Sequence, residues 1–221
     1  MAKVKGPLLS LGASGQIGKA QVYANWRGIP YARQHVVPSN PNTLAQQSTR
    51  NTFASLDELF KRSGPIAREP WVAEAQRRPV TDRNMYIKAN LPPLRGAADM
   101  SGFVGSNGAK GGLPPSAVVA ADSVTANAID VTVTSPAAPT GWTLFAVQAV
   151  AVRDRDPALT PTEFVHEVED VAPTAAGDTV LTIPDCVVAG VYYVAAWTKW
   201  QKPDGSFAYG ASLTDGPVTI V

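Results

Sequence analysis

The sequence predicts an α+β N-terminal region, built from a β-hairpin and helices, followed by an all-β sandwich. The charge pattern favours this division: residues 1–98 hold 14 basic and five acidic side chains, a net charge of +9, whereas residues 99–221 hold five and 13, a net charge of −8. Six glycines lie between these halves, in residues 96–116. From residue 116 onward, short apolar runs alternate with turn residues at intervals of about 8–12 residues, which is typical of β-sandwiches.

The composition excludes several classes of protein. Apolar residues make up 45% of the 221 residues and charged residues 17%, which excludes a disordered, highly charged chain. The single cysteine, Cys186, excludes an intrachain disulfide and a multi-cysteine metal site. Apolar stretches are far shorter than the roughly 18–20 residues of a membrane span, and residues 1–13 lack the pattern of a signal peptide. We expect a soluble protein of a reducing compartment that does not contact membranes.

A β-hairpin is predicted after a glycine-rich N-terminal arm. Val22, Ala24 and Trp26 alternate with polar or aromatic neighbours, which is the period of a half-buried strand. The turn Arg27-Gly28 leads into a returning strand over residues 29–37, and Pro30 places that strand at a sheet edge, at least locally. Because a two-stranded hairpin is marginal alone, we expect it to pack against another surface, such as another protein.

Three helices are expected after the hairpin. The longest covers residues 44–62, where no Gly or Pro occurs, with Asn40-Pro41 as its start signal and Gly64-Pro65 as its stop. Shorter helices are expected over residues 69–78 and over residues 83–90, the last capped by Asp82.

The second half of the chain predicts seven or eight strands. The dense glycines of residues 96–115 predict a linker or extended arm. We therefore divide the chain into a basic anchoring region (1–95), a linker (96–115) and an acidic sandwich (116–221). The expected strands cover residues 129–134, 142–152, 164–171, 179–183, 191–200, 207–213 and 218–221, with an eighth before Asp122.

This second half resembles a fibronectin type III or immunoglobulin-like domain. Residues 189–197 (AGVYYVAAW) are similar to the penultimate strand of that family, with a tyrosine near its start, and residues 208–214 and 217–221 are similar to its last strand. The tryptophan that such domains often carry in an early strand is missing from residues 126–135. The resemblance implies an adhesion, display or structural role more often than catalysis.

No motif predicts chemistry. The glycines at positions 12, 15 and 18 fit neither a phosphate-binding loop nor a dinucleotide fingerprint. His166 alternates with Phe164 and Val168, so a packed or edge histidine is favoured over a catalytic one, and His35 has no serine-containing motif near it. Cys186 is interpreted as a core residue. Several acidic residues gather in this half, and we interpret them as solvated turns and an acidic face rather than a cation site. They are Asp154, Asp156, Glu163, Glu167, Glu169 and Asp170.

We accordingly expect no enzymatic activity, no cofactor and no metal site. The candidate partner-binding residues lie in the basic half, where cationic and aromatic side chains are interleaved: Lys19, Trp26, Arg27, Tyr31, Arg33 and Arg50. Such a set could also stack on nucleic acid, which is an alternative. A weaker alternative is host-glycan binding through Trp197, Trp200 and Tyr209. The opposite charges of the two halves are equally explained by attraction between the halves, within one chain or head to tail between copies.

The first 95 residues resemble a family of uncharacterised proteins from tailed bacteriophages and prophages. The similar positions are Gly15–Lys19, Trp26–Arg33, Val37-Pro38, Asn40-Pro41, Thr43, Gln46-Gln47, Arg50, Phe53, Pro70-Trp71 and Arg83-Asn84. The resemblance implies a virion component made in the bacterial cytoplasm, and no catalytic residues.

Three roles follow as expectations. The first is a head-decoration or minor capsid protein whose basic half docks on the major capsid protein or another virion subunit, in several copies per particle, while the sandwich projects. The second is a tail or neck component with the same anchor. The third is a DNA-binding protein with an acidic accessory domain.

Overall fold

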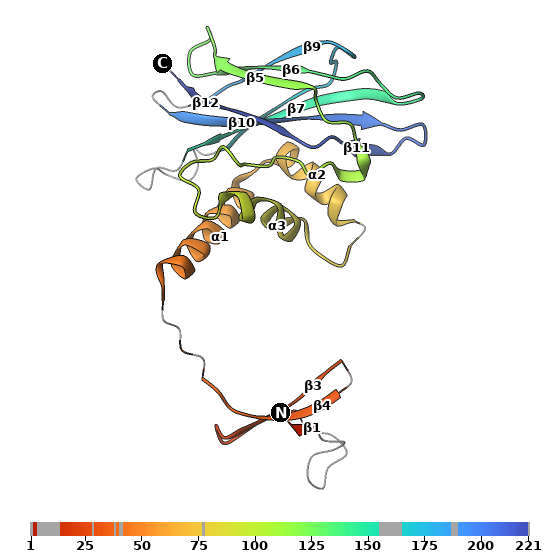
Figure 1. Cartoon of the computed structure of the whole chain (residues 1–221). Coiled ribbons are helices and arrows are strands. Elements are labelled where there is room, and N and C mark those ends of the chain that lie inside the picture. Colours follow the sequence, from red (N-terminus) through yellow and green to blue (C-terminus); the bar gives the residue numbers. More distant parts are fainter. Residues whose placement is uncertain are drawn as a thin grey trace. The chain divides into compact units, whose positions relative to one another are not determined.

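The computed structural model describes residues 2–3, 14–27, 29–37, 39, 42–76, 78–154, 165–186 and 190–220 (Figure 1). The chain forms two compact units, Met1–Thr43 and Leu44–Val221. The described residues form a mixed α+β structure whose strands lie in three antiparallel sheets, so the predicted combination of α and β elements is confirmed. No described helix is long and apolar enough to cross a bilayer.

The first unit is a small antiparallel sheet with the strand order β1-β4-β3-β2. The predicted hairpin is present as β3 (Gln21–Trp26) and β4 (Ile29–Gln34), in which Trp26 pairs with Ile29. Strands β1 (Ala2–Lys3) and β2 (Gly15–Ile17), which the sequence did not reveal, extend it on both sides. The returning strand was expected at a sheet edge, but β4 is an inner strand of this sheet: it lies between β1 and β3, and Pro30 adjoins the two residues that pair with β1.

Two of the three helices differ from the prediction at their ends. Helix α1 (Leu44–Arg62) has the expected bounds. Helix α2 (Pro65–Ala75) begins four residues earlier than expected, because a proline needs no backbone hydrogen bond at the first helical position. Helix α3 (Asp82–Leu94) is capped by the Thr81 hydroxyl, which accepts a hydrogen bond from the Asn84 amide (3.3 Å), and not by Asp82. Its last turn continues through two prolines to the buried Leu94.

The second half of the chain contributes two sheets. A three-stranded sheet has the order β5-β6-β9, formed by β5 (Ala117–Asp122), β6 (Ile129–Thr134) and β9 (Asp178–Ile183). A five-stranded sheet is centred on β7 (Thr143–Arg153) and β10 (Val191–Gln201). Its outer strands are β8 (Val165–Asp170) beside β7, and β11 (Phe207–Tyr209) and β12 (Leu213–Thr219), which both pair with β10.

The two sheets pack face to face around one apolar core. Strands β6 and β9 are buried at every second residue, so one face of their sheet is covered and the other faces solvent. The covered residues of β6, such as Val131, share a cluster with Ala149 of β7, Val194 of β10 and the fully buried Trp200. The sandwich thus forms largely from the predicted strands. Its C-terminal end differs, because β11 ends at Tyr209 and β12 covers Leu213–Thr219, where strands over 207–213 and 218–221 were expected.

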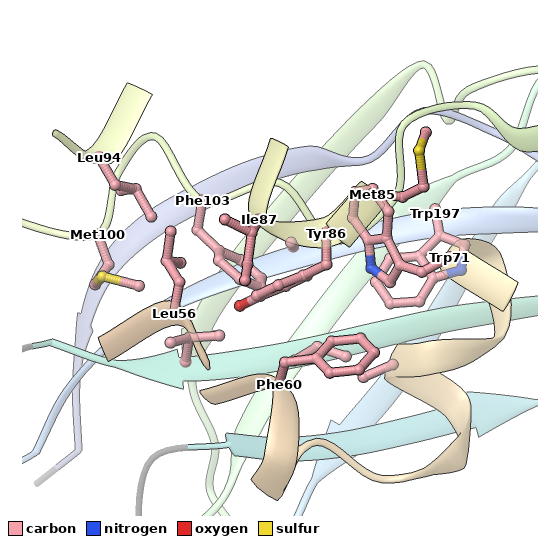
Figure 2. Packing of buried hydrophobic residues seen from close by; sticks show 14 of the residues in the cluster. Leu56, Phe60, Trp71, Met85, Tyr86, Ile87, Leu94, Met100, Phe103 and Trp197 are labelled. Carbon is pink, nitrogen blue, oxygen red and sulfur yellow. The ribbon is translucent and has the colours of Figure 1, made fainter. Parts of the chain in front are cut away.

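The five-stranded sheet is buried on its other face as well, by the three helices. Tyr193, Ala195 and Trp197 of β10 point into a second cluster, seen close by in Figure 2. In that cluster the ring of Tyr86 from α3 lies 5.2 Å from Phe60 of α1 and 5.5 Å from Trp71 of α2, measured between ring centroids. The unit therefore has three layers, in the order helices, five-stranded sheet, three-stranded sheet (Figure 1).

The structure divides the chain differently from the expected segments 1–95, 96–115 and 116–221. The expected linker is packed on the sheet: Met100, Phe103 and Ala109, the first residue of the short 3₁₀ helix η1 (Ala109–Gly111), are buried in the helix-side cluster. Gly105 lies so close to Trp197 that a Cβ atom would stand 2.5 Å from the indole. The glycines here allow close approach rather than flexibility, and the boundary lies instead between residues 43 and 44.

We predict that a chain of residues 44–221 keeps its fold, whereas residues 116–221 alone do not. Without the helices, the helix-side face of the five-stranded sheet, including Tyr193 and Trp197, would be exposed to water. Thermal unfolding followed by circular dichroism should give the 44–221 chain the melting temperature of the full chain's larger unit, and the 116–221 chain a value at least about 10 °C lower, or aggregation. Equal melting temperatures would contradict this account of the helical layer.

Candidate functional site

The described residues of the first unit's sheet form no core of their own. Among its described residues from Ser14 to Thr43, none is buried. The strand register places Trp26 opposite Ile29, Ala24 opposite Tyr31, and Val22 opposite Arg33, and residues that face each other across antiparallel strands project from the same side. We call these six residues the aromatic face. The Trp26 side chain is 62% exposed, so this face is available to a partner.

The first unit is also uniformly basic. Residues 1–43 contain no Asp or Glu and carry five cationic residues, which are Lys3, Lys5, Lys19, Arg27 and Arg33. The Arg27 guanidinium lies 5.0 Å from the centre of the Trp26 ring, so a cation borders the aromatic face at its turn. Arg27 and Lys19 both have left-handed backbone angles (φ 50° and 59°), as turn residues do. An apolar surface edged by positive charge, with no internal carboxylate, fits an anionic partner surface.

The structure brings together most of the predicted partner-binding residues. Trp26, Tyr31 and Arg33 share the aromatic face, and Arg27 borders it. Lys19 lies in the turn between β2 and β3. Arg50 belongs to α1 in the second unit.

The prediction missed Val22 and Ile29 as members of the aromatic face. Strand alternation had already placed Val22 on the side of Trp26. The pairing of Trp26 with Ile29 across the hairpin turn adds Ile29 to this face. Some residues named in the sequence analysis lie outside the described residues, namely Lys5, the glycine at position 12, Gly28 and Asn40-Pro41.

A buried polar network joins α2 to the five-stranded sheet. Gln148 of β7 is fully buried; its amide nitrogen donates to Glu69 (2.7 Å) and to Glu169 (2.9 Å), and its oxygen accepts from the Trp197 indole (2.7 Å). The Lys199 ammonium donates to the other Glu69 oxygen at 2.6 Å. These contacts satisfy polar groups that the helical layer removes from water.

The ionisation of Glu69 follows from this network. Burial by itself raises the pKa of its carboxyl, but hydrogen bonds from Lys199 and Gln148, together with the Lys199 charge, outweigh burial and lower the pKa below the ordinary 4.5. Burial and the neighbouring Glu69 raise the pKa of the Tyr209 hydroxyl. Every charge in the network is paired with a neighbour, so its evident role is to hold α2 on the sheet.

Strand β8 supplies a second attachment for α2. The Glu167 carboxylate accepts hydrogen bonds from the backbone amides of Ala67 (2.9 Å) and Ile66 (3.4 Å) in the first turn of the helix. A Cβ atom on Gly64 would collide with this carboxylate, so a larger residue there would displace Glu167 from the amides. The sequence interpretation of Glu167 and Glu169 as a solvated acidic face is therefore wrong: Glu167 binds the first turn of α2, and Glu169 accepts a hydrogen bond from Gln148 of the five-stranded sheet. Asp156 and Glu163 lie outside the described residues.

The remaining candidates for chemistry are packed side chains. His166 lies on the sandwich side of β8, opposite Ala151 and 5.9 Å from the ring of Tyr192, so the predicted packed histidine is confirmed. Cys186 is buried in the sandwich core, as predicted, and burial followed by the charge of Asp185 raises the pKa of its thiol to about 12. Among the described residues, no group of three or more His, Cys, Asp or Glu side chains could hold a metal ion.

The suggested glycan site is wrong. Trp197 and Trp200 are fully buried, and Tyr209 is almost so, because β10 and β11 are covered on both faces. Stacking on a sugar requires exposed rings, and in the described structure these three rings pack inside the protein.

Comparisons with protein-family models, with curated proteins and with solved structures found no match. Function is therefore inferred from the surfaces of the chain itself.

We predict that the substitution Glu69→Gln destabilises the protein in a pH-dependent way. Because 34% of the Glu69 side chain is exposed, solvent screens its ion pair, and we expect a loss of about 1–2 kcal/mol at neutral pH. A lowered folded-state pKa contributes stability above the ordinary pKa of 4.5, and this contribution is lost as pH falls through the folded value. The difference between wild type and variant should therefore shrink below about pH 4.5.

Urea unfolding at a series of pH values measures this difference. Glu74→Gln is the matched control on the same helix, because Glu74 pairs with the half-exposed Arg78 four residues later, and it should change stability by less than about 0.5 kcal/mol. A wild-type advantage over Glu69→Gln that stays constant into acid would contradict the role given to the carboxylate.

Proposed function

We propose that this protein is a non-enzymatic structural component of a tailed-bacteriophage virion, a head-decoration or minor capsid protein. In this proposal the first unit docks on a subunit of the particle, the major capsid protein or another virion protein, and the larger unit projects as a display module. The observation that carries the proposal is the sheet of residues 1–43, which has no buried described residue, an exposed aromatic face and five basic side chains without an acid. A sheet of this kind needs a partner surface to be stable.

The similarity of residues 15–84 to the phage family supports the choice of particle. Of the positions that carry the similarity, Trp26-Arg27 and Arg33 lie in the first unit, and Phe53 lies in the middle of α1. In the larger unit, the three helices and the buried charged residues serve to attach the helical layer to the five-stranded sheet. This arrangement suits a display module rather than an enzyme.

We further propose that the sandwich is a fibronectin type III-like or immunoglobulin-like domain. Its support is two packed antiparallel sheets in the orders β5-β6-β9 and β8-β7-β10-β12, with strands consecutive in sequence crossing between sheets as in Greek-key sandwiches. Tyr192 and Tyr193 stand near the start of the penultimate long strand, β10. The helical layer on the outer side of the five-stranded sheet would be an addition to such a domain.

Quantitative mass spectrometry of purified, nuclease-treated particles tests the virion role, with heads and tails separated before digestion. We expect the protein in heads, at an abundance near that of the major shell protein. A few copies confined to tails would assign it to the tail or neck instead. Absence from both fractions would refute the virion role, and tight, steeply salt-dependent binding to DNA of any sequence would then favour the DNA-binding alternative.

We predict that the double substitution R27E/R33E removes the protein from particles. It reverses both arginines at the aromatic face and so repels an anionic partner. The matched control is K88E/R95E, which makes the same charge change on exposed residues of the helical layer. Particles assembled in the presence of R27E/R33E should contain at least about tenfold less of the protein than wild-type particles, whereas K88E/R95E should be incorporated at the wild-type level. Equal incorporation of both would show that the basic sheet is not the anchor.

A further inference from the structure

The outer face of the β5-β6-β9 sheet is the second exposed sheet face of this protein. The register places Val119, Thr132 and Val180 in one row across the three strands, and the Val119 and Val180 side chains are 58% and 61% exposed. The neighbouring rows carry Asp130 and Asp178 on the same side. This face therefore has an apolar centre bordered by carboxylates, and we call it the acidic face.

The three strands that form the acidic face carry no basic side chain. Strands β5, β6 and β9 contain three Asp residues and no Lys or Arg. More widely, no Lys or Arg occurs in residues 111–152 or 156–198. The carboxylates of Asp130 and Asp178 each accept one hydrogen bond from a threonine on the same face (2.7 and 2.6 Å), which leaves further acceptor sites for a guanidinium.

The acidic face complements the aromatic face of the first unit in both properties. The acidic face has exposed valines and only negative charge. The aromatic face has Trp26, Ile29 and Val22, and only positive charge, from Arg27 and Arg33. Contact between them would cover the apolar centres of both and place arginines near carboxylates. Complementary charge also disfavours contact of either face with itself, since like charges would then meet.

The length of the connecting segment favours a neighbouring copy over the same chain. Nine residues separate the end of β4 from the start of α1, and they span at most about 30 Å when fully extended. Helix α1 belongs to the layer on the opposite side of the five-stranded sheet from the acidic face, and the layers are each about 10 Å apart. A connection within one chain would have to pass both layers round the edge of the sandwich, whereas a neighbouring copy meets no such requirement.

We propose that the aromatic face of the first unit docks on the acidic face of a second copy of this chain. The contact is head to tail, so that each copy offers one face of each kind and copies join into rings or open chains. This inference rests on the docking role proposed for the first unit, and it names the partner of that unit.

The test is self-association of the purified, nuclease-treated full-length protein, measured by sedimentation velocity. Wild type should form dimers and larger species that dissociate as salt is raised from about 0.05 to 0.5 M. Two variants each disable one face: R27E/R33E and D130K/D178K. Each alone should associate at least about tenfold more weakly than wild type. Mixed in equal amounts, they should associate again, because each then supplies a face that its partner accepts.

Two further variants guard against misfolding and against a general charge effect. V119K/V180K adds positive charge to the acidic face at two exposed positions without altering a carboxylate, and it should also be monomeric and be rescued by R27E/R33E. E58K/D204K makes the same charge change as D130K/D178K on α1 and in the turn before β11, and it should associate like wild type. Rescue in a mixture shows that both members are folded.

Three results would overturn the inference: a wild type that is monomeric at every concentration, association lost in R27E/R33E but unchanged in D130K/D178K, or association that requires added nucleic acid. These results are separable from the virion role. Loss of R27E/R33E from particles without any self-association would keep the virion role and refute the second copy as partner. Self-association of a protein that is absent from particles would support the second copy as partner and refute the virion role.

Discussion

The larger unit depends on a sheet that is apolar on both of its faces. Strands β7 and β10 are buried along almost their whole length, one side against the β5-β6-β9 sheet and the other against the helices. A strand pair of this kind cannot be left half-covered without exposing rings such as Trp197 to water. The helices depend on it in turn, because α2 and α3, with 11 and 13 residues, are too short to be stable alone.

The polar contacts of the larger unit are consequences of this burial. Where the helical layer covers the sheet, it also covers Gln148 and Lys199. Gln148 donates hydrogen bonds to carboxylates on α2 and β8, and Lys199 donates one to the carboxylate on α2. The basic residues of the helical layer are similarly occupied: Arg62 pairs with Glu58 at 2.9 Å, Arg83 pairs with Asp57, and Arg68 donates to main-chain oxygens at the end of α1. Much of the positive charge in residues 44–95 is therefore used inside the unit.

The first unit has the opposite physical character. None of its described residues from Ser14 to Thr43 is buried, and its five basic side chains have no carboxylate within residues 1–43 to pair with. Counted by compact units, the charge is +5 for residues 1–43 and −4 for residues 44–221. The imbalance that remains after internal pairing is thus concentrated in a small sheet that needs a partner, which is why docking is the function inferred for it.

The sequence alone determined the local elements, because hydrophobic periodicity, proline and glycine act over a few residues. It located α1, the hairpin around Arg27 and the strands of the sandwich up to β10, and strand alternation put Trp26 with Val22. It failed wherever the decisive neighbour is distant in sequence. Gly105 was interpreted as part of a flexible linker because its contact with Trp197 is made 92 positions later, and Glu167 as solvated because it binds the amides of Ile66 and Ala67 about 100 positions earlier. Only the tertiary structure could decide that the helices cover the sheet, since that choice depends on the combined apolar area of strands and helices that no local pattern reveals.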